Sequence, residues 1–266
     1  MEQLIDPEEV SRFENATWSR CARGYMDGFG ALAGEAIRPL LDEVKVSRGN
    51  RVLDVGTGPG LVALAAAERG ATVVGVDFSE AMLAEARRLH PEVEFRTASA
   101  EALPFTDGAF DAVVGNFTLH HSGRPAKVLK EAFRVLAVDG RVGFTVWADL
   151  AKLEAFGLFF AAVAEHAGAA ELPHGPLFGV SDFDVFRTML REAGFRESSV
   201  RELPMVWRMR SIDSFLAAFR DWAQLNAFPN DVRDRIEATV RERASVYRSG
   251  DGFAMPNPAI LLSAVK

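Results

Sequence analysis

Two acids in this chain stand where a nucleoside ligand would be held. Asp54 lies in an apolar run and precedes Gly56, Gly58 and Gly60, and Asp77 ends the next apolar run, about 20 residues past the glycines. Glycines between a strand and a helix let a ligand approach the backbone and face the free N–H groups of the helix. A carboxylate at the end of the following strand suits ribose hydroxyls. We therefore expect a nucleoside-binding site here.

The acid before the glycines indicates which kind of nucleoside is bound. Asp54 would repel a pyrophosphate, but it can accept hydrogen bonds from an ammonium group or from the loop itself. A dinucleotide fingerprint requires Gly-x-Gly-x-x-Gly, and Leu61 stands where its third glycine would be. The residues therefore favour a zwitterionic nucleoside such as S-adenosylmethionine over a dinucleotide.

The elements around these residues predict how they are positioned. Strands and helices alternate from Arg51 to about Trp147, which predicts a parallel sheet covered on both faces. Ser79 is suited to cap the second helix, and Pro125 is suited to begin the third. The predicted strands are residues 52–55, 72–77, 93–98, 110–116 and 141–147, and the predicted helices are residues 61–69, 80–90 and 125–136.

The pattern changes beyond Trp147. We expect a long apolar helix over 151–167, a Gly/Pro-bearing loop over 171–179 and a helix from a Ser181 cap to Ala193. The other predicted elements are a sixth strand over 197–210, helices from Ser211 and from Asn230, and a seventh strand over 253–265. Segments outside the sheet should gather at the carboxyl ends of the parallel strands and enclose the ligand as a lid.

Together these motifs resemble motifs I and II of the class I S-adenosylmethionine-dependent methyltransferases. The likeness is to their small-molecule branch (type 11), which includes the ubiquinone/menaquinone-biosynthesis methyltransferases, and it covers roughly residues 49–144. It extends to the stretches 98–105 and 110–121. The resemblance implies an α/β, Rossmann-like, seven-stranded and mostly parallel sheet with helices on both faces. It also implies that the last strand is antiparallel and that a helical lid covers the cofactor end.

The resemblance also implies a domain organisation and a cofactor site. Residues 1–45 would form an N-terminal helical lid segment, and 46–266 a methyltransferase domain with lid insertions at about 150–180 and 211–250. The implied cofactor is S-adenosyl-L-methionine, with S-adenosyl-L-homocysteine as its product. The implied cofactor-binding residues are Tyr25, Asp54, Gly56, Gly58, Gly60, Asp77, Phe78, Met82, Ser99, Ala100, Glu101 and Asn116.

Several of these residues receive a specific role from the resemblance. Asp54 would support the glycine loop and the methionine amino group, to which Asn116 would offer its backbone. Asp77 would bind the ribose, and Phe78 and Met82 would cover the adenine.

Two residues of the implied site either differ from the family pattern or allow a second interpretation. The family usually has Asp at the position of Ser99, so the adenine amino group would meet an uncharged hydroxyl, and the Ala100 amide would bond a ring nitrogen. Tyr25 also has the spacing of a packing stripe with Trp18 and Phe29, and both interpretations stay open.

His120 and His121 are the candidate catalytic residues. They follow the fourth predicted strand, near the expected methyl acceptor, and histidine can act as a base near neutral pH. The alternative is that one packs under the lid and the other faces solvent. His166 and His174 are expected to stay outside the pocket. Aromatic residues in the lid segments suit a flat or apolar substrate, namely Phe156, Phe159, Phe160, Phe178 and Phe183, with Trp147 as a further wall candidate.

The composition and net charge of the chain argue against several classes of binding partner. A net charge of -7 argues against a general nucleic-acid binder, and Cys21 is the only cysteine, so no intrachain disulfide or cysteine metal cluster is expected. No apolar run reaches the roughly 18 residues that a membrane span needs. The first residues lack a basic, apolar signal segment, so we expect a cytoplasmic protein. Its expected partner is a small-molecule substrate, and both a monomer and a homodimer are compatible with the sequence.

The sequence therefore predicts transfer of a methyl group from S-adenosylmethionine to a small, partly apolar or aromatic acceptor by in-line displacement. A nucleotide-dependent oxidoreductase is a rival that Asp54 and the glycine spacing oppose. A second alternative is a protein of the same fold that binds the cofactor but has a regulatory role or catalyses a different reaction. The family's fold alone does not choose between these roles.

Overall fold

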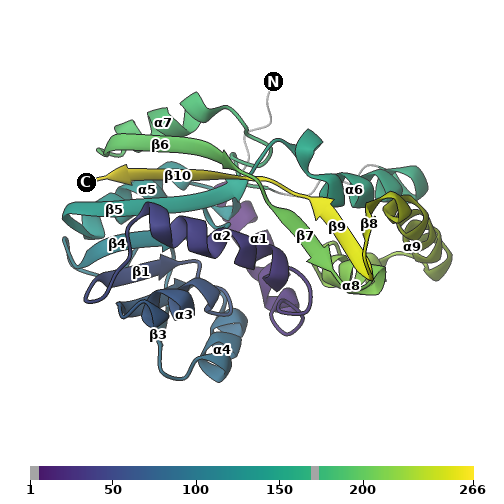
Figure 1. Cartoon of the computed structure of the whole chain (residues 1–266), viewed down its shortest axis with the longest axis horizontal. Coiled ribbons are helices and arrows are strands. Elements are labelled where there is room, and N and C mark those ends of the chain that lie inside the picture. The colour runs from purple at the N-terminus through teal and green to yellow at the C-terminus, as the bar shows by residue number, and fades with distance from the viewer. Residues whose placement is uncertain (1–5, 169–173) are drawn as a thin grey trace.

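The central element is a seven-stranded sheet in the order β3-β2-β1-β4-β5-β10-β6. It is seen in a computed structural model that describes residues 6–168 and 174–266 (Figure 1). The strands are β1 (Arg51–Val55), β2 (Thr72–Asp77), β3 (Glu94–Thr97), β4 (Phe110–Gly115), β5 (Leu136–Trp147), β6 (Arg196–Leu203) and β10 (Ala259–Val265). Strands β1 to β5 pair in parallel, whereas β10 is antiparallel to both of its neighbours. The predicted fold is confirmed.

Helices cover both faces of this sheet because the strands are apolar on both sides. On β1, Val52 belongs to one buried cluster and Leu53 to another, as successive side chains of a strand point to opposite faces. The first cluster packs against α2 (Gly30–Glu43), α3 (Leu61–Glu68) and α4 (Glu80–Leu89). The second packs against α5 (Pro125–Val135) and α7 (Phe183–Glu192).

Local signals explain where several helices begin. The Ser79 side chain accepts a hydrogen bond from the Met82 amide at the start of α4, and Pro125 occupies the first turn of α5, both as predicted. The predicted Ser181 cap is wrong. The Asp182 side chain caps α7 instead, because it accepts the Asp184 amide.

The sixth and seventh predicted strands are each divided in two. Beyond Leu203, the chain leaves the main sheet and continues as β7 (Val206–Met209) in a three-stranded sheet with β9 (Gly252–Pro256) and β8 (Arg248–Ser249). Proline has no amide to donate to a strand ladder, and Pro204 and Pro258 stand at the two breaks. The two chains bend away together, since the Asn257 amide donates to the Met205 carbonyl at 2.9 Å.

The small sheet and three helices form a cap at one end of the molecule. These helices are α6 (Glu154–Ala167), α8 (Ile212–Trp222) and α9 (Asn230–Ala244), to the right of the main sheet in Figure 1. Ser211 caps α8 as predicted, through a bond from the Ser214 amide. Trp207 and Phe219 fill the middle of the cap and are fully buried.

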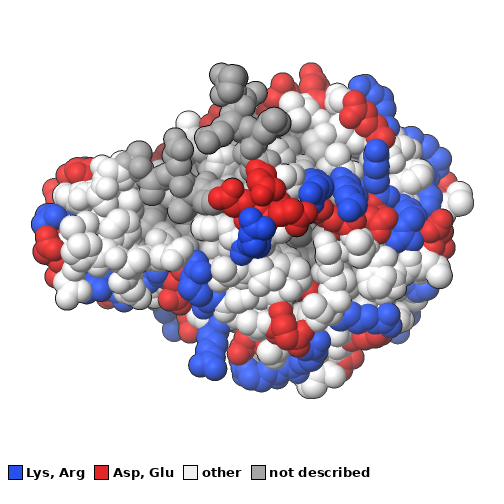
Figure 2. All heavy atoms as spheres, turned by 180° about the vertical axis from the view of Figure 1, so that it is seen from behind, with Lys and Arg blue, Asp and Glu red and all other residues white. Residues whose placement is uncertain are grey.

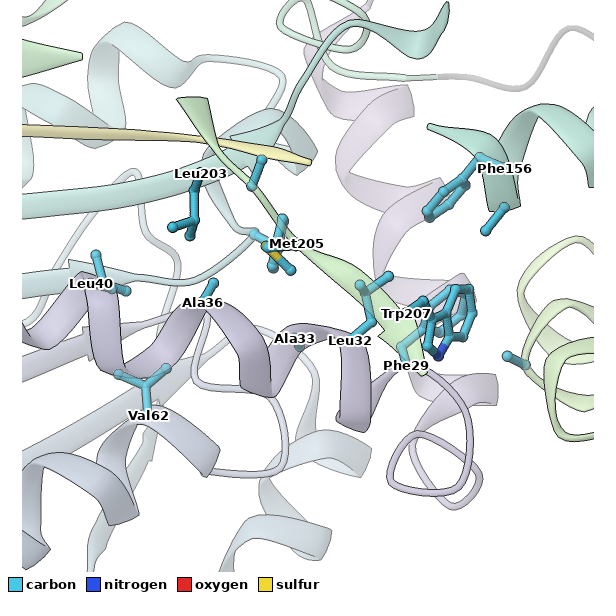
Figure 3. Packing of buried hydrophobic residues seen from close by; sticks show 14 of the residues in the cluster. Phe29, Leu32, Ala33, Ala36, Leu40, Val62, Phe156, Leu203, Met205 and Trp207 are labelled. Carbon is cyan, nitrogen blue, oxygen red and sulfur yellow. The ribbon is translucent and has the colours of Figure 1, made fainter. Parts of the chain in front are cut away.

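The N-terminal helices join the cap to the sheet. Helix α1 (Pro7–Cys21) packs against α4 and α8, and α2 lies against β5 and β7. Figure 3 shows the seam, where Leu40 and Ala36 of α2 lie near Leu203 and Met205. Trp207 and Phe29 stack at a ring-centroid distance of 5.5 Å, so the apolar core is continuous from the sheet into the cap.

The surface carries charges of both signs. On the face in Figure 2, acidic and basic side chains are intermixed, and no broad basic area is visible among the residues described there. This agrees with the acidic balance of the sequence. In the ranges 6–168 and 174–266, no helix has the length and hydropathy to cross a bilayer.

Candidate functional site

A cavity of about 460 Å³ lies beyond the carboxyl ends of β1, β2 and β4. Residues that directly follow these strands line it, among them Gly56, Phe78 and Asn116. Helix α1, the loop after β5 and the end of α8 complete the walls with Glu14, Leu150 and Trp222. The cavity therefore stands where open α/β sheets bind ligands.

The three glycines of the loop serve different purposes. All three have positive φ, from +53° to +88°, which favours glycine. A Cβ atom at Gly56 would lie 2.4 Å from the Thr118 side chain, and one at Gly60 would lie 2.8 Å from Phe95. A Cβ atom at Gly58 would meet nothing within 4 Å. Gly56 and Gly58 line the cavity, whereas Gly60 lies behind it at the start of α3.

Asp54 lies behind the wall of the cavity. Its Oδ2 accepts the Thr57 hydroxyl at 2.6 Å, and its Oδ1 has no hydrogen-bond partner among the described residues. Burial raises the pKa of Asp54 to about 7, against the lowering effects of the Thr57 bond and of the nearby Ala63 amide. A buried acceptor without a partner requires an explanation, such as an ammonium group or a water that reaches it.

Asp77 connects the glycine loop to the end of β2. Its Oδ2 accepts the Gly58 amide at 2.9 Å, and its Oδ1 accepts the Ser79 amide at 2.8 Å. Burial raises the pKa of Asp77, although the bonds from these amides act in the opposite direction. A carboxylate has about four lone-pair sites, so Asp77, which lines the cavity, can still accept two hydroxyls.

The residues predicted around the adenine gather on one wall. All five line the cavity: Phe78, Met82, Ser99, Ala100 and Glu101. The Ser99 hydroxyl accepts the Glu101 amide at 3.2 Å, which fixes the turn that follows β3. The Glu101 carboxylate is held elsewhere, since it accepts the Ser122 hydroxyl at 2.8 Å and pairs with Arg124 at 3.3 Å.

Asn116 keeps its side chain away from the ligand. Its Nδ2 donates to the Ala33 carbonyl at 3.0 Å, and its Oδ1 accepts the Thr145 hydroxyl at 2.6 Å. Because the amide is committed to α2 and β5, the backbone is the part of Asn116 that remains for the cavity, which is compatible with its predicted role. Tyr25 lines the cavity and also packs against Trp18 at 6.0 Å, so its position is compatible with both interpretations.

The two candidate histidines have different surroundings. His121 lines the cavity, and its Nδ1 lies 3.0 Å from Oε1 of Glu14. His120 is 2% exposed and does not line the cavity, and neither of its ring nitrogens has a partner in the described ranges. Burial, and then the nearby His121, hold the pKa of His120 well below its ordinary value. Of the two candidate histidines, only His121 lies where it could act as a base in the cavity, and the position of His120 does not support a catalytic role for it.

Comparison with known proteins shows which protein family this chain resembles. A family model described as a methyltransferase domain matches residues 53–144. The demethylmenaquinone methyltransferase of Renibacterium salmoninarum is 40% identical over 105 residues, 40% of this chain and 44% of that protein. The ubiquinone/menaquinone biosynthesis C-methyltransferase of Roseobacter denitrificans is 30% identical over 187 residues, 62% of this chain and 74% of that protein.

The chain belongs to the S-adenosylmethionine-dependent methyltransferase family. It nevertheless matches only 44% of the length of the Renibacterium relative. The YcgJ protein of Bacillus subtilis shares the fold, with a TM-score of 0.58, 20% identity and coverage of 87% of this chain and 97% of that one. So does the [4+2]-cyclase SpnF, with a TM-score of 0.54, 22% identity and coverage of 87% and 80%.

The cavity of this methyltransferase-family chain has a largely aromatic lining. Besides Phe78, its aromatic lining residues are Trp18, Tyr25, Phe29, Phe117, Trp147, Phe156, Phe178 and Trp222. Of the predicted lid aromatics, Phe156 and Phe178 reach the cavity, whereas Phe159 is buried in the core. His166 lies 2.7 Å from the Thr239 hydroxyl and His174 stacks on Phe178, and neither lines the cavity, as expected.

The sequence predicts that residues 1–45 belong to the lid, but it does not identify Glu8 and Glu14 of α1 as cavity residues. Glu8, Glu14 and Trp18 of this helix line the cavity, and Arg124 pairs with Glu8 at 2.9 Å across its edge. The only local signal was an amphipathic helix, which does not say which face meets a ligand. Within the described residues, no cluster of metal-ligating side chains is present.

Proposed function

We propose that this protein binds S-adenosylmethionine in the 460 Å³ cavity and transfers its methyl group to a small aromatic or partly apolar acceptor. The observation that carries the proposal is that two unlike sets of residues line one space. One set is the glycine loop with the Asp77 carboxylate, and the other is a group of aromatic side chains.

The residues present fit the cofactor. The open space beside Gly58 gives a ligand access to the backbone, and the unpartnered Asp54 oxygen suits a positive charge. Asp77 would hold the ribose hydroxyls, and Ser99 and the Ala100 amide would meet the adenine edge. When bound, the cofactor supplies a methyl group on a positively charged sulfur.

The protein's main task would be positioning and exclusion of water. The acceptor atom must lie in line with the methyl–sulfur bond, about 3 to 3.5 Å from the methyl carbon. We propose that segments 1–45, 150–180 and 211–250 act as the lid over domain 46–266. The cavity residues Trp18, Leu150 and Trp222 come from these three segments and support the assignment. Residues 1–5 and 169–173 of the proposed lid lie outside the described residues.

The nature of the acceptor follows from the aromatic wall and from the relatives. Three tryptophans, Trp18, Trp147 and Trp222, face the cavity, and flat rings stack well on such side chains. The relatives named above are quinone-biosynthesis methyltransferases, so a quinol-like ring is the acceptor class that we propose.

Two measurements test this function. Calorimetry should show heat on binding of S-adenosylhomocysteine, and Asp77→Ala should weaken it by more than tenfold because charged hydrogen bonds contribute about 1.5–3 kcal/mol each. Incubation with carbon-13-labelled S-adenosylmethionine and a metabolite extract should give a labelled methyl product. Absence of binding would refute the proposal. Binding without any transfer would favour a cofactor-binding protein with another role.

A further inference from the structure

A buried carboxylate lies beside the candidate base in the cavity. Glu14 of α1 is 5% exposed, and its Oε1 lies 3.0 Å from Nδ1 of His121. Its Oε2 accepts the Trp18 indole N–H at 3.0 Å. Burying a carboxylate is costly unless polar groups compensate it, and here two groups from different parts of the chain do so.

The contact decides which nitrogen of His121 carries the proton. If Nδ1 presented a lone pair to the carboxylate at 3.0 Å, the two acceptors would repel each other. Nδ1 therefore carries the proton and points it at Glu14, which leaves the lone pair on Nε2 at the opposite edge of the ring.

Two neighbouring rings restrict the imidazole further. The Trp18 ring meets it edge-on at a centroid distance of 5.1 Å, and the His120 ring lies 4.1 Å from it on the tilt. Trp18 is itself held by Glu14, so the carboxylate fixes both the base and the aromatic wall next to it.

We propose that Glu14 is a positioning residue that orients His121 as the proton acceptor for an aromatic hydroxyl, an inference that rests on the methyltransferase function proposed above. An unprotonated amine needs no base before it attacks a methyl group, whereas a phenol gains nucleophilicity when its proton is removed. The aromatic wall around Trp147 and Phe156 suits the ring that carries this hydroxyl.

In the proposed step, the O–H bond of the acceptor breaks, and its proton binds to Nε2 of His121. An electron pair of the oxygen forms the new O–CH₃ bond. The methyl–sulfur bond breaks, its electron pair stays on sulfur, and a neutral thioether remains. Glu14 keeps its carboxylate throughout and stabilises the imidazolium that forms.

The first test reads the histidine tautomer by nitrogen-15 NMR in the full-length protein. His121→Asn identifies the His121 signals among the five histidines. We expect the neutral ring to carry its proton on Nδ1, and Glu14→Leu to shift it towards Nε2. Glu14→Gln, which keeps an acceptor oxygen, should restore the Nδ1 form. Glu9→Leu, at an exposed position of the same helix, is the matched control and should change nothing. A wild-type ring protonated on Nε2 would overturn the proposal, even if Glu14→Leu failed to fold.

The second test compares 1-naphthol with 1-naphthylamine as acceptors. We expect a methyl ether from the naphthol and slower turnover of the amine. Glu14→Leu should lower kcat by about 10²-fold or more, the typical contribution of a positioned base, while the KM for S-adenosylmethionine stays unchanged. Faster turnover of the amine, an unaltered kcat, or turnover of neither probe despite cofactor binding would contradict the proposal. Failure of the methyltransferase function itself would show as absent cofactor binding, or as cofactor binding without any labelled product from the metabolite extract.

Discussion

Ser99 is the residue at which the resemblance predicts an uncharged contact to the adenine. Its hydroxyl accepts the Glu101 amide and faces the cavity, so it can meet the adenine amino group without a charge. A charged acceptor forms a stronger bond than a neutral one. We expect Ser99→Asp to bind S-adenosylmethionine at least as tightly as the wild type, by up to about tenfold, and Ser99→Ala to bind it more weakly. Calorimetry on the three proteins measures this, and a large loss of affinity in Ser99→Asp would contradict the placement.

Most of the proposed cofactor residues could be singled out from the sequence because they lie at strand ends. Asp54, Asp77 and Asn116 follow a regular alternation, so their shared edge of the sheet follows from the order of the elements alone. Glu14 was not predictable in this way. Its partner His121 comes from a distant part of the chain, and only the packing of α1 against the short 3-10 turn Leu119–His121 brings the two together. His121 lines the cavity whereas His120 is buried, and this difference in their surroundings also follows from the packing of the elements.

The position of α1 over the cavity leads to a prediction about its mobility. Five residues of this helix line the cavity: Glu8, Ser11, Glu14, Asn15 and Trp18. Asn15 also donates to the Phe78 carbonyl at 3.3 Å, which links the helix to the segment after β2. Binding of S-adenosylhomocysteine should therefore slow amide exchange in α1 strongly.

Hydrogen exchange followed by mass spectrometry measures this effect. Helix α7 is the internal control, because it lies outside the proposed lid segments and none of its residues, Phe183–Glu192, lines the cavity. Equal protection of α1 and α7, or none in α1, would argue against a lid role for the N-terminal segment.

Two glycines in regular elements should respond to alanine in opposite ways. A Cβ atom at Gly115 of β4 would lie 2.4 Å from the Phe144 ring and 3.1 Å from the Val55 carbonyl. Gly115→Ala should lower the free energy of unfolding by about 1–3 kcal/mol through overpacking. Gly157 of α6 is exposed and has nothing within 4 Å, so Gly157→Ala should raise it by about 0.5–1 kcal/mol. Urea unfolding measures both variants, and shifts of the same sign would contradict this account.

The sheet was predictable element by element, whereas the division of its last strands was not. The segments around Leu203 and Ala259 look like continuous strands, because their apolar residues continue on both sides of the break. Pro204 and Pro258 were the local signals. Only the tertiary structure, in which both chains bend together and pair again as β7 and β9, shows that they mark a second sheet.

At the scale of the whole molecule, the buried titratable groups connect stability to pH. Burial raises the pKa of Asp54 from 3.8 to about 7, so between these values the folded protein holds a proton that the unfolded chain has lost. The free energy of unfolding then falls as pH rises through this window. His120 acts in the opposite sense: its lowered pKa means that the unfolded chain takes up a proton first as pH falls below 6.5. The two effects on the free energy of unfolding have opposite signs. The pH profile of the wild type alone therefore does not separate the contribution of Asp54 from that of His120.

The variant Asp54→Asn isolates the acidic contribution. Asparagine resembles the protonated carboxyl, so we expect the stability of the variant relative to the wild type to be higher near pH 8 than near pH 5, where the wild type has lost only part of this contribution. The relative gain should grow by about 1–4 kcal/mol between the two pH values, because each unit of pKa shift corresponds to about 1.4 kcal/mol. Urea unfolding at both pH values measures it, with Asp251→Asn as an exposed control that should change neither. If the difference between Asp54→Asn and the wild type were the same at both pH values, Asp54 would titrate normally in the folded protein. The charge of Asp54 would then already be compensated without the cofactor's ammonium group.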